Sequence, residues 1–260
     1  MRIIPTLLWK GPGLVKGARF DSWRRVGPVL PAIEVYNARD VDEIVLLDVA
    51  ASLDGTPPDI ASLSRFARHC FVPLTFGGGI TELDTLRELL RNGADKISIN
   101  TAAFIHPELI RDASQTFGSQ CITVSIDARR VDTGEHLCYS HSGTRPTGWE
   151  VSDWARHLEA LGAGELLVTS IDQDGTMEGY DLELIRKVVD SVGIPVIASG
   201  GAGSYDDMLA AVRDAGASAV AAASVFHFRE LTPAGARRHL AAHGIPVRAT
   251  QTAAGTAASS

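Results

Sequence analysis

The sequence predicts a single (β/α)8 barrel, and three observations lead to that fold. Short β-rich apolar runs alternate with helix-like segments along the chain, a pattern typical of a parallel sheet. Eight such runs are present, the number that closes a parallel sheet on itself. The two halves of the chain also resemble each other. With 260 residues, 45% of them hydrophobic, the chain suits one barrel core.

The elements follow one another in strict alternation. The expected strands, in chain order, are Ile3–Leu8, Ile44–Val49, Val72–Phe76, Ile97–Asn100, Ile122–Asp127, Leu166–Ile171, Pro195–Ser199 and Ala219–Ala223. Helical spacing is clearest in Leu83–Gly93, Asp153–Gly162 and Asp181–Gly193, each of which ends in glycine, the usual C-terminal stop. An open doubly wound sheet is the structural alternative.

An internal repeat favours the closed barrel. VPLTFGGGI, a helix and NGADKISINTAAF resemble IPVIASGGAG, a helix and AGASAVAAASVF. Ser199 lies 122 positions after Gly77, and Ala223 lies 123 positions after Asn100. Two similar four-strand halves fit a closed barrel better than an open sheet. The barrel is expected to span residues 1–248, and the small polar segment 249–260 is expected to be a disordered tail, or partly a cloning remnant.

The same symmetry raises a question about the first strand. RIIPTLLWKGPGLVKG starts like a buried strand and ends in a glycine-rich loop, and CITVSIDARR has the same apolar texture. Leu8 precedes Asp127 by 119 positions, close to the repeat spacing. Leu8 therefore stands where the second half has an aspartate at the end of its strand.

Composition excludes several classes of function. A net charge of −7 without a basic cluster makes nucleic acid an unexpected partner. The sequence has no run of 18 or more apolar residues, so no membrane span is expected, and the start MRIIP does not resemble a signal peptide. Three cysteines without CxxC spacing suit reduced thiols, so we expect a cytoplasmic protein. No spacing indicates a metal site or another cofactor, and the eight histidines are interpreted as surface or packing residues.

Glycine-rich segments predict two phosphate-binding loops. FGGGI and SGGAG each end a strand, and NTAA and AASV follow the next strand in each half. Bare glycines let backbone N–H groups approach an anion, and a helix N-terminus favours negative charge. The candidate residues are Gly201, Gly203, Ala223 and Ser224 in one half, and Gly79, Asn100 and Thr101 in the other. One loop alone would indicate a tight turn, but two related loops favour a ligand with two phosphates.

Carboxylates are expected at the same mouth, because catalytic groups of such barrels stand at the C-terminal ends of strands. Asp48, Asp127, Asp172 and Asp174 all fall there. Asp127 ends an otherwise apolar strand, so we expect it to act as acid or base. Asp172 and Asp174 could reach a ligand from one loop, although turn formation explains at least one of them.

Four charges mark the opposite ends of the strands. Arg2, Glu43, Lys96 and Glu165 each stand at the first position of a strand. Taken singly, each is an ordinary surface charge beside a barrel strand. Together, two positive and two negative charges at equivalent depth could form a ring across the barrel floor. Because a confined charge is costly unless paired, such a ring suggests a gate.

These segments resemble the HisF family, the cyclase subunit of imidazole glycerol phosphate synthase. The resemblance runs from RIIP to GIPVR and includes FGGGI, GADKISINTAA, SIDARR, GAGELLVTSIDQDGT and ASGGAG in order. It implies that ammonia from a HisH-like glutaminase, in a heterodimer, enters through the floor and reacts with a bisphosphorylated ribulosyl substrate. It further implies a gate at the four strand-start charges, acid or base chemistry at Asp127, and substrate contact at Lys16, Asp172, Asp174 and Ser199. The floor is the expected docking face, with Asp95 and Gln120 near its rim.

The first strand departs from this family. A pattern like CLDVKDGRVVKG is replaced by TLLWKGPGLVKG, with Leu8 at the position of a catalytic aspartate. This form resembles HisF-like paralogues of bacterial surface-sugar clusters, where the pair supplies ammonia to a separate sugar amidotransferase that forms an acetamidino group. Three functions stay open: an ammonia-conducting partner in sugar amidination, a histidine-biosynthesis cyclase in which Asp48 covers for Leu8, and a non-catalytic scaffold that activates its glutaminase.

Overall fold

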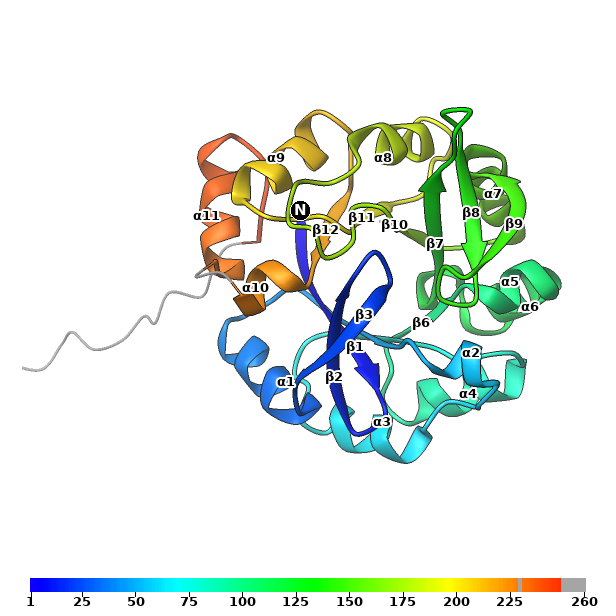
Figure 1. The fold of residues 1–260 in the computed structure, drawn as a ribbon. Coiled ribbons are helices and arrows are strands. Elements are labelled where there is room, and N and C mark those ends of the chain that lie inside the picture. The colour runs from blue at the N-terminus through cyan, green and yellow to red at the C-terminus, as the bar shows by residue number, and fades with distance from the viewer. Residues whose placement is uncertain (229–230, 249–260) are drawn as a thin grey trace, which may run out of the picture.

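Eight parallel strands close into a barrel in the computed structural model, which describes residues 1–228 and 231–248 (Figure 1). The barrel strands are β1 (Arg2–Lys10), β4 (Ile44–Asp48), β5 (Leu74–Gly77), β6 (Lys96–Ile99), β7 (Ile122–Arg130), β10 (Glu165–Ser170), β11 (Val196–Ser199) and β12 (Ala219–Ala222). Strand β1 pairs with β4 and β12, and β7 pairs with β6 and β10, so the ring has no open edge. The closed barrel is confirmed and the open sheet is excluded.

Helices surround the strands (Figure 1). They are α1 (Val29–Ala38), α2 (Ala51–Asp54), α3 (Ile60–Ala67), α4 (Leu83–Arg91), α5 (Thr101–Ile105), α6 (Glu108–Phe117), α7 (Val151–Leu161), α8 (Leu182–Val189), α9 (Tyr205–Arg213), α10 (Ser224–Phe228) and α11 (Pro233–Ala242), with a 3-10 turn at Ser119–Cys121. Gly162 ends α7 in a left-handed conformation, as its position in the sequence predicts. The expected tail, 249–260, lies outside the described residues.

Each half of the barrel carries an antiparallel hairpin. Strand β1 continues into β2 (Gly13–Ala18) and β3 (Asp21–Gly27), and β7 continues into β8 (His136–Ser140) and β9 (Arg145–Glu150). The prediction of a glycine-rich loop after β1 was therefore wrong. Gly17 lies inside strand β2, where an added Cβ would press on Trp23 and on the backbone of Asp21. Here glycine permits close strand contact instead of breaking the strand.

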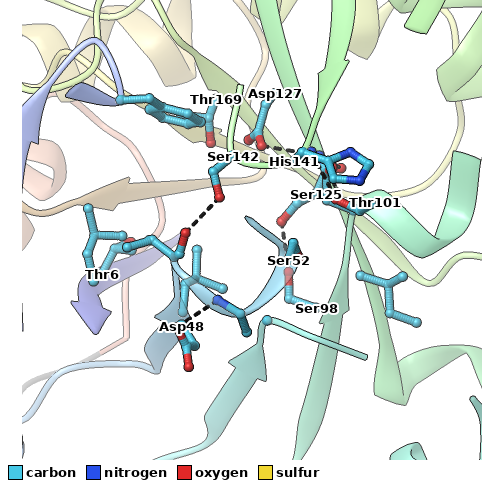
Figure 2. Close-up of a pocket in the computed structure, with 18 of the residues that line it drawn as sticks. Thr6, Asp48, Ser52, Ser98, Thr101, Ser125, Asp127, His141, Ser142 and Thr169 are labelled. Carbon is cyan, nitrogen blue, oxygen red and sulfur yellow. Dashed lines mark hydrogen bonds between the residues drawn. The ribbon is translucent and has the colours of Figure 1, made fainter. Parts of the chain in front are cut away.

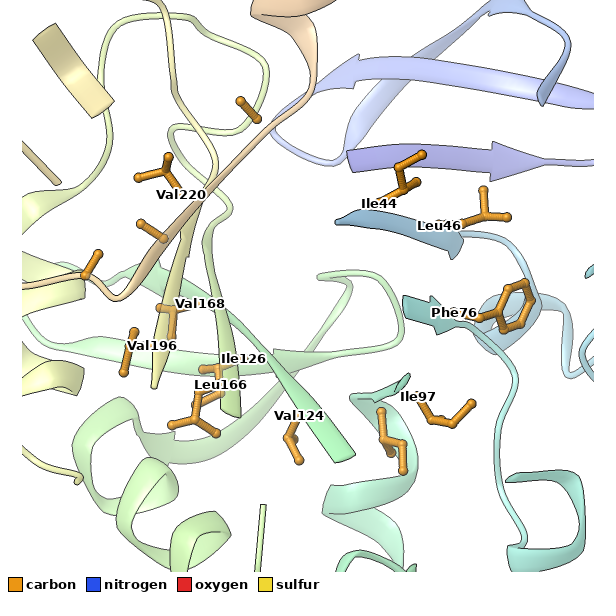
Figure 3. Close-up of a cluster of buried hydrophobic side chains, with 14 of the residues drawn as sticks. Ile44, Leu46, Phe76, Ile97, Val124, Ile126, Leu166, Val168, Val196 and Val220 are labelled. Atoms are coloured by element: carbon orange, nitrogen blue, oxygen red, sulfur yellow. The ribbon is translucent and has the colours of Figure 1, made fainter. Parts of the chain in front are cut away.

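Side chains alternate between the outside and the inside of the barrel. Outward residues such as Ile44, Phe76 and Val124 form the large core beneath the helices (Figure 3). A second cluster fills the interior and consists of Ile4, Val45, Leu167, Ile197, Ala219 and Ala221. Because the side-chain period of a strand is two residues, Arg2 shares the inward face with Ile4. The strand starts thus point into the floor and the strand ends into the mouth.

Within residues 1–228 and 231–248, no helix combines the length and the apolar character needed to cross a bilayer.

Candidate functional site

A cavity of about 670 Å³ opens at the C-terminal ends of the barrel strands (Figure 2). The position agrees with the mouth at which catalytic groups of such barrels gather. The candidate residues that line it are Leu8, Asp48, Gly79, Asn100, Thr101, Asp127, Asp174, Ser199, Gly201, Ala223 and Ser224. Residues from both halves of the sequence therefore meet in one space.

Asp127 stands at the centre of a polar network on one wall of the cavity. Its Oδ2 accepts a hydrogen bond from Asn100 Nδ2 at 3.2 Å, and the same amide nitrogen donates to the Ser125 carbonyl at 3.1 Å. Burial, with a smaller contribution from the negative charge of Asp174, raises the pKa of Asp127 to about 7. A carboxyl group with that pKa exchanges protons readily at neutral pH, which suits a general acid or base.

Lys16 lies behind the cavity wall and not on its surface. Strand β2 places it at 3% exposure, where its Nζ donates to the Thr6 carbonyl at 3.2 Å. Burial lowers the pKa of Lys16 to about 7, against the attraction of Asp174. Burial also raises the pKa of Asp174 to about 6, although Lys16 opposes this shift. Lys16 thus lowers the pKa of Asp174 from behind the cavity wall, and Asp174 itself faces the cavity.

Two predicted contacts are directed elsewhere. Asp172 accepts the backbone N–H of Arg130 at 3.0 Å and pairs with Arg129 Nε at 3.3 Å, so its carboxylate holds the base of a hairpin. Gly203 donates its N–H to Asp207 Oδ2 at 2.9 Å, which closes the start of α9. Neither Asp172 nor Gly203 is among the described residues that line the cavity.

Leu8 faces the cavity from β1, two residues before the end of that strand and beside Leu47 on the paired strand β4. The position on β1 that the internal repeat relates to Asp127 is therefore occupied by an apolar side chain, next to another apolar side chain on β4. Asp48 lies one residue further along β4, and its Oδ1 accepts the N–H groups of Ala50 and Ala51 at 2.9 and 3.2 Å. Burial nevertheless raises the pKa of Asp48 above its usual value. Asp48 is the residue considered above as a replacement for the acid missing at Leu8. One of its two carboxylate oxygens is therefore already hydrogen-bonded to backbone N–H groups.

The glycine loops approach neighbouring backbone closely. Gly79 has a φ of +70°, and a Cβ there would lie 2.5 Å from the Thr56 carbonyl. Gly201 has a φ of +104°, and a Cβ there would collide with the Gly179 carbonyl. Both glycines are thus required by the turns themselves, and both expose backbone to the cavity.

The four strand-start charges meet across the opposite end of the barrel. Arg2 contacts Glu43 and Glu165 at 2.7 Å each, and Lys96 contacts the same carboxylates at 3.0 and 2.7 Å. Glu43 and Glu165 are buried, whereas the side chains of Arg2 and Lys96 keep 31% and 18% exposure. These contacts form a closed ring of alternating charge, which we call the floor ring. Asp95 and Gln120, the expected rim residues, precede β6 and β7 at this end.

Hydroxyl groups lie both at the floor ring and at the cavity, and the sequence analysis did not identify them. Thr75 Oγ1 donates to Glu43 at 2.6 Å, and Thr123 Oγ1 donates to Glu165 at 2.9 Å. Further along the same side of the barrel, Ser98 Oγ and Ser125 Oγ lie 2.7 Å apart and border the cavity (Figure 2). The inward period-two register of β5, β6 and β7 could have revealed these hydroxyls.

Two of the histidines interpreted as surface or packing residues also border the cavity, one of them, His106, at an exposed position. His106 follows α5, and His141 lies in the turn between β8 and β9. Their scattered positions in the sequence gave no sign that separate turns bring them to one space. Over the described residues, no group of three or more His, Cys, Asp or Glu side chains is arranged to hold a metal ion.

A family model described as histidine biosynthesis protein matches residues 2–232, nearly the whole chain.

Proposed function

The chain belongs to the histidine biosynthesis protein family, and from that membership we propose that it is a HisF-type synthase subunit. It receives ammonia from a HisH-like glutaminase at the floor and binds a phosphorylated ligand at the mouth. The observation that carries this proposal is the combination of a closed charge ring at one end of the barrel with the Asp127 cavity at the other.

The floor ring supports a gated entrance. The two buried carboxylates can remain charged, because each has two cationic partners. A small neutral molecule needs only a local change in one of these pairs to pass. Ammonia fits this requirement, and a glutaminase docked over the ring would release it away from water.

The hydroxyl side of the interior supports a route for ammonia. Thr75 and Thr123 contact the floor ring, and Ser98 and Ser125 border the cavity. Successive inward positions on a strand are about 6.6 Å apart, so these hydroxyls offer hydrogen-bond partners at two depths. The apolar cluster around Ile4 and Val45 occupies the rest of the interior and excludes competing water.

The residues at the mouth support the proposal of a ligand with two phosphates. The residues Gly79, Asn100 and Thr101 lie on one side of the cavity, and Gly201, Ala223 and Ser224 belong to the repeat-related loops. The cavity volume suits a small molecule, and Asp127 lies between the two sets in the order of the strands around the barrel.

Leu8 favours one of the two candidate acceptors of ammonia. Cyclisation and cleavage need one group to give a proton and another to take it, and leucine does neither. We therefore propose that the ammonia serves sugar amidination by a separate sugar amidotransferase, with weakened or altered chemistry at the mouth.

A histidine-biosynthesis cyclase is the second candidate. Asp127 has a pKa of about 7. Asp48 follows Leu47, the residue paired with Leu8, and its pKa is also raised. These two groups would supply the acid and the base if Asp48 turned its free oxygen to the substrate.

Reconstitution with a HisH-like glutaminase from the same genome tests the proposal. We expect a stable heterodimer in which glutamine is hydrolysed faster than by the glutaminase alone. Supplying either the bisphosphorylated ribulosyl substrate or a sugar acceptor with its amidotransferase then separates the candidates by the product formed. A chain that neither binds the glutaminase nor changes its rate would contradict the proposal.

A further inference from the structure

The cavity has an unusual charge balance for a phosphate site. Its described lining includes four carboxyl side chains, from Asp48, Glu82, Asp127 and Asp174, and no lysine or arginine. The nearest lysine considered above, Lys16, is buried behind Thr6. Among the described lining residues, only histidine can supply a positive side chain to a phosphate dianion.

His141 is held in place by nearly all of its polar atoms. Its backbone N–H donates to Thr101 Oγ1 at 3.0 Å, and its carbonyl accepts from Thr144 Oγ1 at 2.7 Å. Its Nδ1 lies 3.0 Å from Ser140 Oγ. The next residue reaches the segment just after β4, where Ser142 Oγ donates to the Val49 carbonyl at 2.8 Å. These contacts fix the backbone and one side of the imidazole ring.

The backbone of this turn is strained at the position that faces the cavity. His141 and Ser142 both have a φ of +51°, in the left-handed region. Residues other than glycine adopt this conformation at an energetic cost, and such strain concentrates at functional sites. Histidine in this region is less costly than a β-branched residue, since it is one of the types enriched there.

The hydrogen bonds leave Nε2 available for a ligand. Ser140 Oγ donates to the Arg145 carbonyl at 3.4 Å, so its lone pair can accept Nδ1–H of His141. Neutral His141 then has a bare Nε2, and protonated His141 keeps the same contact while Nε2–H becomes a donor. The ring can thus gain a proton without moving.

We propose that His141 is a phosphate-binding residue whose Nε2–H donates to the phosphate held beside Asn100 and Thr101. The inference rests on the proposed phosphorylated ligand. It adds a side chain that changes its protonation when the ligand binds, so that ligand binding takes up a proton. Burial and the charge of Arg145 lower the pKa of free His141, which leaves it largely neutral until a dianion arrives.

Other ionisable groups affect the same equilibrium and must be separated from His141. Arg145 on β9 opposes its protonation, and Asp127 on β7 and Asp174 after β10 are carboxyl groups of the same cavity. His106 ends α5, and Asp48 and Glu82 lie on the remaining walls. Because all of these groups stay in place in a His141 variant, the difference between wild type and variant isolates the imidazole.

Proton NMR tests the inference without catalysis. The probe is the bisphosphorylated ribulosyl substrate of imidazole glycerol phosphate synthase, added to the full chain without ammonium. His141→Asn identifies the His141 signal by its loss, and asparagine tolerates the left-handed backbone. We expect saturation with the probe to raise the pKa of His141 by about one unit, because tenfold tighter binding to the protonated form shifts it by that amount.

Calorimetry gives the matching affinities at pH 6.5 and 8.5. His141→Asn should weaken binding several-fold at pH 6.5, because a pKa rise of about one unit limits the loss to less than about tenfold, and should approach wild type at pH 8.5. His243→Asn, at an exposed histidine after α11, should match wild type at both values.

Two outcomes would overturn the inference, and they are distinguishable. If the probe binds, but the pKa of His141 stays unchanged and His141→Asn binds equally at both pH values, His141 shapes only the turn and the proposed function stands. If wild type fails to bind the probe at either pH, the phosphorylated ligand is wrong and the inference fails with it.

Discussion

Replacing Lys96 by methionine removes one of the two cations of the floor ring and keeps most of the side-chain volume. In the intact ring, Lys96 Nζ lies 3.0 Å from Glu43 and 2.7 Å from Glu165. After the change, Arg2 alone faces two carboxylates. Removal of one partner from a buried ion pair costs about 3–5 kcal/mol. Because the Lys96 side chain is 18% exposed, water screens part of the loss. We expect the free energy of unfolding to fall by about 3 kcal/mol, at the low end of that range.

Urea unfolding at pH 7 and pH 4 measures this effect and its origin. Burial opposes the charged form of Glu165, but Arg2 and Lys96 hold its pKa below the usual value. A carboxyl group whose pKa is lower in the folded protein stabilises the fold above its unfolded pKa, and this contribution is lost as the pH falls. The deficit of Lys96→Met should therefore be largest at pH 7 and smaller at pH 4.

A double variant supplies the control for the ring. Adding Glu43→Gln to Lys96→Met restores a one-to-one charge balance between Arg2 and Glu165, and glutamine can still accept the Thr75 hydroxyl. The double variant should recover part of the lost stability at pH 7. A single variant as stable as wild type, or a double variant less stable than the single one, would refute the electrostatic account of the ring.

Further predictions concern the mouth and the fold. Leu8→Asp should raise cyclase turnover with ammonium salt, by up to the 10²–10⁴-fold that acid–base catalysis supplies; unchanged turnover would direct attention to Asp48. Ser224→Glu should weaken calorimetric binding of a bisphosphorylated ribulosyl ligand at least about tenfold through charge repulsion, while unaltered affinity would exclude this loop. Asp127→Asn should increase stability in urea progressively between about pH 4 and pH 7, because the raised pKa makes ionisation costly to the folded state; a pH-independent difference would contradict that cause. Arg237→Ala should cost about 3–5 kcal/mol because Arg237 and the neighbouring Asp42 are 2% and 5% exposed, whereas Arg248→Ala, 46% exposed beside the same aspartate, should cost at most about 1 kcal/mol.

Alternation and the internal repeat were sufficient to predict the barrel and the order of its strands, whose ends lie within three residues of the expected positions. Period-two register fixes which side chains point inward, so the strand-start charges had to meet at the floor once the sheet closed. The same register brought Asp127 and Leu8 to one mouth. These predictions succeeded because they depend on the backbone pattern alone.

Predictions that depended on loops were less complete. The glycines after β1 suggested a loop, yet Gly17 allows two strands to approach each other, and the resulting hairpin buries Lys16. Asp172 had the same sequence context as Asp174, but Arg129 and the backbone of Arg130 hold it outside the cavity. Tertiary contacts of this kind leave no periodic signal. His141 was missed for the same reason, because a turn brings it back over the mouth.

The central claim is that ammonia travels through the barrel from the floor to the mouth, and isotope competition tests it most directly. The reconstituted pair is supplied with glutamine carrying ¹⁵N in its amide, in an excess of unlabelled ammonium, and the product nitrogen is analysed by mass spectrometry. The account predicts that wild-type product keeps the ¹⁵N label, and that Ser125→Leu, which replaces a hydroxyl of the route by a bulky apolar group, loses the label while free ammonium still reaches the mouth. Wild-type product labelled only in proportion to the bulk ammonium pool would contradict the account.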